Sequence, residues 1–103
     1  MAIVNITKAN YEELVNVPGK KVLLDFWAPW CGPCRMVGPI VEEISNERTD
    51  LTVGKVNVDE ELELAMKFGV ASIPTLVVLE SGEVLETSVG YRPKADILDL
   101  IGD

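Results

Sequence analysis

The chain has 103 residues and a formal net charge of −8, with no histidine, and 48% of its residues are hydrophobic. This length and composition are typical of one globular domain, so we expect a single domain over residues 1–103. The negative charge argues against nucleic acid and anionic membrane surfaces as partners, and no apolar stretch is long enough to span a bilayer.

In the first half of the chain, strand patterns alternate with helix patterns. Residues 3–7 predict a short strand, after which Asn10 and Glu13 have the spacing of a capping box at the start of a helix. Residues 22–28 (VLLDFWA) form an almost continuous apolar run, which is typical of a strand covered on both faces. The segment 31–46 then repeats apolar residues at helical spacing, which predicts a second helix.

In the second half, residues 51–58 predict a strand, and Asp59 is in position to cap a helix over 60–68. Residues 75–79 and 83–89 are separated by a short turn, which predicts an antiparallel hairpin. A last helix follows from position 93, where a proline suits the first turn. The element order βαβαβαββα predicts an α/β fold with a mixed five-stranded sheet and four helices over its two faces.

Two cysteines, Cys31 and Cys34, lie three positions apart where an apolar strand gives way to a helix. Structural zinc would need about two more Cys or His ligands, and covalent haem needs a histidine where the chain has Arg35, so we expect no metal. An iron–sulfur cluster would have to be shared between chains, and a purely structural disulfide in so small a loop stabilises little. A Cys-x-x-Cys pair beside a βαβ pattern favours redox chemistry.

The position of the pair predicts an order of chemistry. Unpaired N–H groups and the dipole at a helix start favour negative charge, so Cys31 is expected to be the attacking thiolate. Cys34 lies one turn inside the helix, where less water is expected, and would attack Cys31 in the mixed disulfide to release the substrate. Gly32 leaves room for the incoming sulfur, and Pro33 stiffens the turn between the cysteines.

Two charged residues interrupt apolar strands. Asp25 lies inside the run 22–28, where it is either a polar residue tolerated near a strand end or a buried acid. Desolvation would raise the pKa of a buried Asp25, which could then take a proton from Cys34. Lys55 interrupts the strand 51–58, and alternation alone allows it to be a solvated edge residue.

Aromatic and apolar residues surround the motif. Trp30 directly precedes Cys31 and is expected at the surface, where it could support the docking of partners, whereas Trp27 is expected in the core. Val70 and Ala71 are candidates to extend an apolar patch around the cysteines. Gly90 would allow a substrate chain to come close, although a glycine at a strand end explains it equally well.

Taken together, these motifs resemble the thioredoxin family. DFWA is followed by WCGPC, and KVNVD at 55–59, IPT at 73–75 and VG at 89–90 follow in the family's order and spacing across essentially the whole chain. The resemblance implies the thioredoxin fold and general reduction of protein disulfides. It also implies that no cofactor is bound besides the redox-active Cys31–Cys34 disulfide, with electrons coming from NADPH through the flavoprotein thioredoxin reductase.

The same resemblance implies roles for single residues. Asp25 would lie beneath the active site, with Lys55 approaching and tuning it. The Ile73–Pro74 bond would be cis and face the cysteines, so that the backbone of Ile73 could pair with an extended substrate segment. Pro33 resembles the reductase type, since oxidising and isomerising relatives more often have histidine there.

We therefore expect a monomeric reductase of disulfide-containing proteins, in the cytoplasm because no signal peptide is visible. One alternative is an oxidase or isomerase in an exported location. Another is a binding subunit that uses the surface around Trp30 and Ile73 without redox chemistry. Tyr91 and Arg92 depart from the family pattern and leave the substrate preference open.

Overall fold

A computed structural model describes residues 3–102 of the chain. In these residues five strands and four helices follow one another in the predicted order, which confirms the α/β class. The elements are β1 (Ile3–Asn5), α1 (Tyr11–Leu14), β2 (Lys21–Trp27), α2 (Gly32–Glu47), β3 (Thr52–Asn57), α3 (Leu62–Lys67), β4 (Thr75–Glu80), β5 (Glu83–Val89) and α4 (Lys94–Ile101). None of the described helices is long and apolar enough to cross a membrane.

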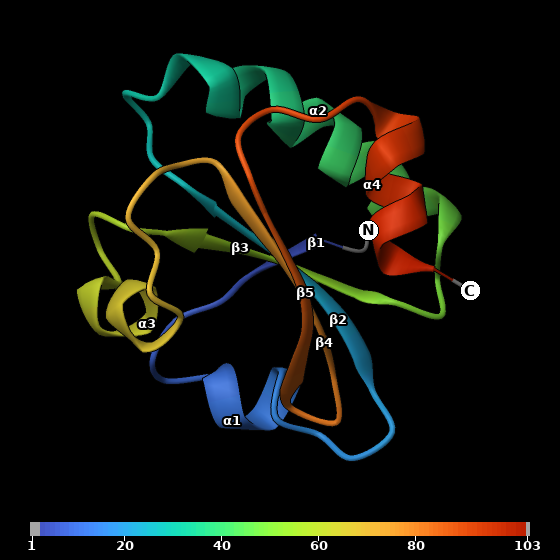
Figure 1. Cartoon of the computed structure of the whole chain (residues 1–103). Helices are drawn as coiled ribbons and strands as arrows, with labels where there is room; N and C mark the ends of the chain where they lie inside the picture. The colour runs from blue at the N-terminus through green and yellow to red at the C-terminus, as the bar shows by residue number, and fades with distance from the viewer. Residues whose placement is uncertain (1–2, 103) are drawn as a thin grey trace.

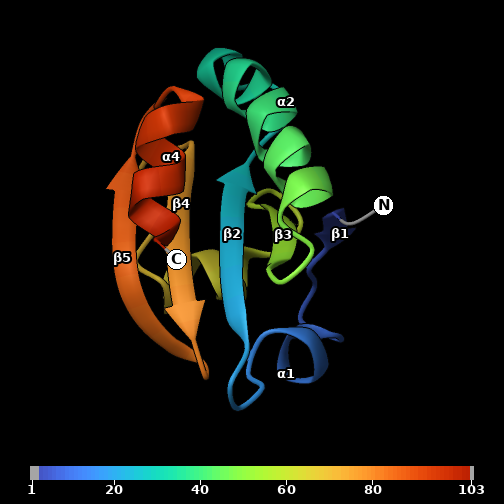
Figure 2. The same ribbon diagram turned by 90° about the vertical axis from the view of Figure 1, so that its right-hand side faces the viewer.

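The strands form one mixed sheet in the order β1-β3-β2-β4-β5, which runs from right to left in Figure 2 and is seen nearly edge-on in Figure 1. β1, β3 and β2 run parallel to each other, whereas β4 is antiparallel to β2 and forms the predicted hairpin with β5. The mixed sheet is therefore confirmed. β2, which leads into the cysteine motif, is the central strand.

Helices cover both faces of this sheet. α2 and α4 lie on one face, while α1 and α3 lie on the other (Figures 1 and 2). Side chains alternate along β2, so that Leu23 packs with Val37 of α2 and Ile97 of α4, whereas Leu24 and Phe26 pack in the core on the opposite face. Asp25 is two residues from Leu23 and thus belongs to the α2 face.

Asn10 is the N-cap residue of α1, as predicted, but its side chain makes no capping bond, whereas the predicted cap at Asp59 is wrong. The Asn10 side chain accepts a hydrogen bond from the Thr7 N–H (2.8 Å) and donates one to the Asn5 carbonyl (2.9 Å), and it makes no capping bond to α1. Asp59 accepts a hydrogen bond from the indole N–H of Trp30, and α3 begins only at Leu62. In both cases a partner outside the helix replaces the local cap.

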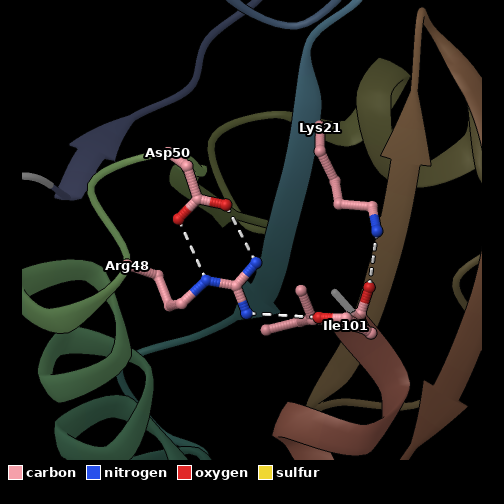
Figure 3. A network of polar contacts seen from close by, with 5 residues as sticks. Lys21, Arg48, Asp50 and Ile101 are labelled. Carbon is pink, nitrogen blue, oxygen red and sulfur yellow. Dashed lines mark hydrogen bonds and ion pairs between the residues drawn. The ribbon is translucent and has the colours of Figure 1, made fainter.

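A polar network closes the fold at the end of α4 (Figure 3). Lys21, at the start of β2, donates from Nζ to the Ile101 carbonyl (2.8 Å), and Arg48 donates from Nη1 to the Gly102 carbonyl (3.2 Å). Arg48 also forms a two-pronged pair with Asp50, at 3.0 and 2.9 Å. The cations thus satisfy carbonyls that the helix leaves without an internal partner.

Candidate active site

The two cysteines form a disulfide at the start of α2, with their Cα atoms 5.3 Å apart. Cys31 is the N-cap residue, and the backbone N–H of Cys34 donates to its Sγ (3.2 Å). A donor directed at this sulfur at a helix N-terminus favours negative charge on Cys31. The expected difference in burial is wrong for this disulfide form, since Cys31 and Cys34 are 4% and 5% exposed. The helix position, rather than burial, distinguishes them.

The turn between β2 and α2 presents the motif to solvent. The Cys31 N–H donates to the Ala28 carbonyl (3.1 Å), which closes the turn, and Arg35 donates to the Pro29 carbonyl (2.9 Å), which holds its outer side. Gly32 and Pro33 occupy the exposed first turn of α2. The disulfide is therefore anchored by a buried strand on one side while its connecting residues remain accessible.

The Ile73–Pro74 bond is cis, as the family resemblance implied, and it faces the cysteines. The Ile73 carbonyl oxygen lies 3.7 Å from Cys31 Sγ. The Gly90 N–H donates to the Pro74 carbonyl (2.8 Å), and Gly90 has a φ of +96°, a conformation that glycine adopts readily. Tyr91, next in the chain, is exposed. Pro74 and Gly90 thus meet beside the disulfide, although they are 16 positions apart in the sequence.

An apolar groove of about 190 Å³ adjoins the cysteines. Its lining residues come from three segments of the chain and are Trp30, Val58, Val70, Ala71 and Ile73. Trp30 is 65% exposed, as predicted, and its Nε1 donates to Asp59 Oδ2 (2.9 Å).

Sequence reasoning did not find that Val58 lines this groove or that Asp59 binds Trp30. The available signal was topological: both residues follow β3, which runs parallel to β2, and the carboxyl ends of neighbouring parallel strands share one edge of the sheet.

Asp25 is a buried acid, because its residue is only 1% exposed. Neither carboxylate oxygen has a hydrogen-bond partner among the described residues. Burial raises the pKa of Asp25 to about 6, while the positive charge of Lys55 acts in the opposite direction. Lys55 is the register partner of Asp25 on β3, and its Nζ lies 4.3 Å from the centroid of the Trp27 ring. It is half-buried.

The described part of the chain contains no group of three or more His, Cys, Asp or Glu side chains arranged to hold a metal ion. Cys31 and Cys34 give the site the chemistry of a dithiol–disulfide pair.

Comparisons with known proteins agree with this arrangement. The thioredoxin family model matches residues 2–103. The chain is 50% identical to thioredoxin of Bacillus subtilis (strain 168) over 102 residues, which covers 98% of this chain and 96% of the relative. It is 47% identical to thioredoxin of Mycobacterium bovis over 103 residues, covering 99% and 89%.

Solved structures show the same fold. The Malassezia sympodialis thioredoxin superposes with a TM-score of 0.87 at 32% identity, covering 98% of this chain and 88% of the other. A mutant thioredoxin from Halobacterium salinarum NRC-1 gives a TM-score of 0.88 at 38% identity, covering 97% and 88%.

Proposed function

The chain belongs to the thioredoxin family and is a dithiol–disulfide oxidoreductase, and we propose that it is a general reductase of protein disulfides in which Cys31 attacks and Cys34 resolves. The observation that carries the proposal is the position of the pair. Cys31 is the N-cap of α2, receives the Cys34 N–H, and lies against the carbonyl of a cis X-Pro bond.

The reaction transfers two electrons to the substrate. The Cys31 thiolate attacks one sulfur of the substrate disulfide, and the other substrate sulfur leaves as a thiolate that takes up a proton. A mixed disulfide now joins Cys31 to the substrate. The Cys34 thiol loses its proton and attacks Cys31 Sγ, which forms the Cys31–Cys34 disulfide and releases the second substrate thiol.

We propose Asp25 as the acceptor of the Cys34 proton. Its raised pKa of about 6 supports this role, because a carboxyl group with that pKa exchanges protons readily near neutral pH. Lys55 would be a positioning residue that keeps the pKa of Asp25 from rising further, since its positive charge stabilises the carboxylate.

Substrate docking is proposed for the surface around the disulfide. Trp30 would contact apolar side chains of the partner, and the backbone of Ile73 would pair with an extended segment. Gly32, Pro33 and Gly90 would leave space for the partner's chain. The exposure of Trp30 and the 3.7 Å separation of the Ile73 carbonyl from Cys31 Sγ support this arrangement.

Each turnover leaves the protein oxidised, so a second partner must return two electrons. We propose that an NADPH-dependent thioredoxin reductase is this partner and that the protein works as a monomer in the cytoplasm. The Cys-Gly-Pro-Cys sequence, which resembles the reductase type, supports a reducing role, and the cytoplasm keeps such thiols reduced.

The test is the reduction of insulin disulfides in the presence of NADPH and a thioredoxin reductase. The rate is measured as the consumption of NADPH. Cys31→Ser is expected to abolish turnover, and Cys34→Ser is expected to trap a mixed disulfide with insulin. Reduction of insulin with dithiothreitol but not with the reductase would overturn only the proposed electron source. A wild-type chain that accelerates neither reaction would overturn the proposed reductase role.

A further inference from the structure

Helix α3 carries two apolar side chains that are mostly in solvent. Leu62 is 66% exposed and Met66 is 78% exposed, so both are at least as exposed as Trp30, the 65% exposed aromatic residue of the groove. The two residues are four positions apart in α3, which places them on the same face of the helix. We call this pair the α3 patch. Adjoining exposed apolar side chains are typical of interaction sites, whereas single ones are common on any protein surface.

The other faces of α3 have partners within the chain. Leu64 packs in the core, and Ala65 is buried. Glu63 and Lys67 line a hollow together with residues of α1, and Glu63 also forms an ion pair with Lys8 (2.6 Å). The α3 patch is therefore the face of the helix that the core and α1 leave to solvent.

The chain both enters and leaves α3 at the groove. Asp59, three positions before Leu62, accepts the hydrogen bond of the Trp30 indole. Val70, four positions after Met66, lines the groove. Three or four residues of chain span at most about 14 Å, so each residue of the α3 patch lies within this distance of a residue of the groove region. The patch thus extends the surface that is proposed for docking.

The charge around the α3 patch indicates what kind of partner fits it. Of residues 59–67, four are acidic and one is a lysine, and the whole chain has a net charge of −8. A second copy of the chain would bring the same negative segment against this one, which opposes self-association. A partner with lysine or arginine around an apolar contact is attracted instead.

We propose that the α3 patch binds the protein that returns electrons to the Cys31–Cys34 disulfide, through an apolar contact rimmed by lysine or arginine on that protein. This inference rests on the proposed function, because it takes an NADPH-dependent reductase as the electron donor. Substrate proteins differ in the surface around their disulfides, whereas the electron donor has one sequence. Fixed side-chain contacts away from Cys31 can therefore be matched to the donor but not to substrates in general.

The size of the groove supports a contact beyond it. A standard protein–protein interface involves about 20–30 residues on each partner. The groove at Trp30 has five lining residues, so a folded partner that docks there also covers neighbouring surface. The α3 patch supplies exposed apolar area beside the groove, where burial stabilises a complex.

The experiment compares full-length variants in two reactions. Leu62→Gln/Met66→Gln removes the apolar contact, and glutamine is about as favourable in a helix as leucine or methionine. With NADPH, limiting thioredoxin reductase and excess insulin, the KM of the reductase for the double variant is expected to rise about tenfold, equivalent to about 1.4 kcal/mol. Each single substitution is expected to raise it about threefold. Insulin reduction driven by dithiothreitol is expected to keep its wild-type rate.

The matched control removes exposed apolar side chains elsewhere. Val84→Thr/Leu85→Gln changes two half-exposed residues of β5 and is expected to leave both reactions unchanged. Thermal unfolding reports whether every variant folds. Raising NaCl from about 0.05 M to 0.3 M is expected to raise the KM of the reductase for the wild-type chain, because salt screens the attraction between the acidic segment and the basic rim.

Three results would overturn the inference and leave the reductase proposal intact. The first is an equal KM of the reductase for the double variant and the β5 control. The second is an equal loss in the dithiothreitol reaction, which would assign the α3 patch to substrates. The third is a wild-type dimer in size-exclusion chromatography that the double variant abolishes, which would assign the patch to a second copy. A wild-type chain that reduces insulin with dithiothreitol but accepts no electrons from the reductase would overturn the proposed electron source and this inference together.

Discussion

Asp25 and Lys55 occupy the same register position on the parallel strands β2 and β3, so a buried carboxylate and a cation share one rung of the sheet. Two effects on the acid oppose each other. Burial raises the pKa of Asp25, the charge of Lys55 lowers it, and burial is the larger effect, which leaves the pKa at about 6. Asp25 can therefore change its protonation state under conditions in which an ordinary aspartate stays ionised.

Asp25→Asn is expected to stabilise the fold at neutral pH. Below the unfolded-state pKa of about 3.9, Asp25 is protonated in both states and has no cost from ionisation. As pH rises toward the folded-state pKa of about 6, the unfolded state loses its proton first, so stability falls. Above about pH 6 the loss in the free energy of unfolding that ionised Asp25 causes is constant, at most about 3 kcal/mol. The gain from asparagine should thus be largest near pH 7 and shrink below about pH 4.

Urea unfolding of both proteins near pH 7 and pH 3.5 measures this gain, with Asp99→Asn, an acid on α4, as the matched control. Insulin reduction near pH 7 should be slower in Asp25→Asn, because Cys34 loses its proton acceptor. An asparagine variant with wild-type stability near pH 7 and a full rate of reduction would contradict both parts of the prediction.

The order of attack can be read from alkylation of the reduced protein. One equivalent of iodoacetamide near neutral pH should label Cys31 well before Cys34, because Cys31 is the N-cap and receives the Cys34 N–H. Mass spectrometry of the peptides quantifies the two sites. Faster labelling of Cys34 would reverse the assigned roles.

Asp59 is expected to support docking through Trp30. Asp59→Ala removes the acceptor of the indole N–H, and a typical hydrogen bond of this kind contributes about 1 kcal/mol. We expect KM for insulin to rise by up to about fivefold with little change in kcat, since the cysteines are untouched. Glu60→Ala, which removes the neighbouring exposed acid, is the control. Equal KM values for the two variants would mean that the Trp30–Asp59 bond does not serve docking.

Lys21 and Lys20 are adjacent in the chain but have different surroundings. Lys21 donates to the Ile101 carbonyl, whereas the Lys20 side chain is exposed. Lys21→Met is expected to reduce the free energy of unfolding by about 1–2 kcal/mol, because a carbonyl at the end of α4 loses a charged donor. Lys20→Met should change it by no more than about 0.5 kcal/mol. Chemical denaturation compares the two, and equal losses would show that the bond to Ile101 contributes nothing measurable.

Patterns that depend on many residues predicted the fold well. The apolar run at 22–28 indicated a strand covered on both faces, and β2 is indeed the central strand of the sheet. Burial of Asp25 follows from the same pattern, because a strand packed on both faces leaves no solvent for either row of side chains.

The hydrogen-bond partners of single polar side chains were not predictable. Asn10 and Asp59 have suitable side chains for helix caps, yet Asn10 binds the backbone of Asn5 and Thr7, and Asp59 binds Trp30, 29 positions away. A local cap and a tertiary hydrogen bond are similar in energy, so the sequence alone does not decide between them. The groove contribution of Val58 likewise depends on the register of β3 against β2.

The network at Lys21 and Arg48 lies at the N-terminal end of β2, and the disulfide follows the C-terminal end of this strand. β2 has 7 residues, so about 20 Å of strand separates the two regions. Free-energy changes at sites this far apart, without shared partners, are usually additive. Substitutions at Lys21 and at Trp30 should therefore combine without epistasis. Selection can then adjust the stability of the fold and the substrate preference as two independent traits.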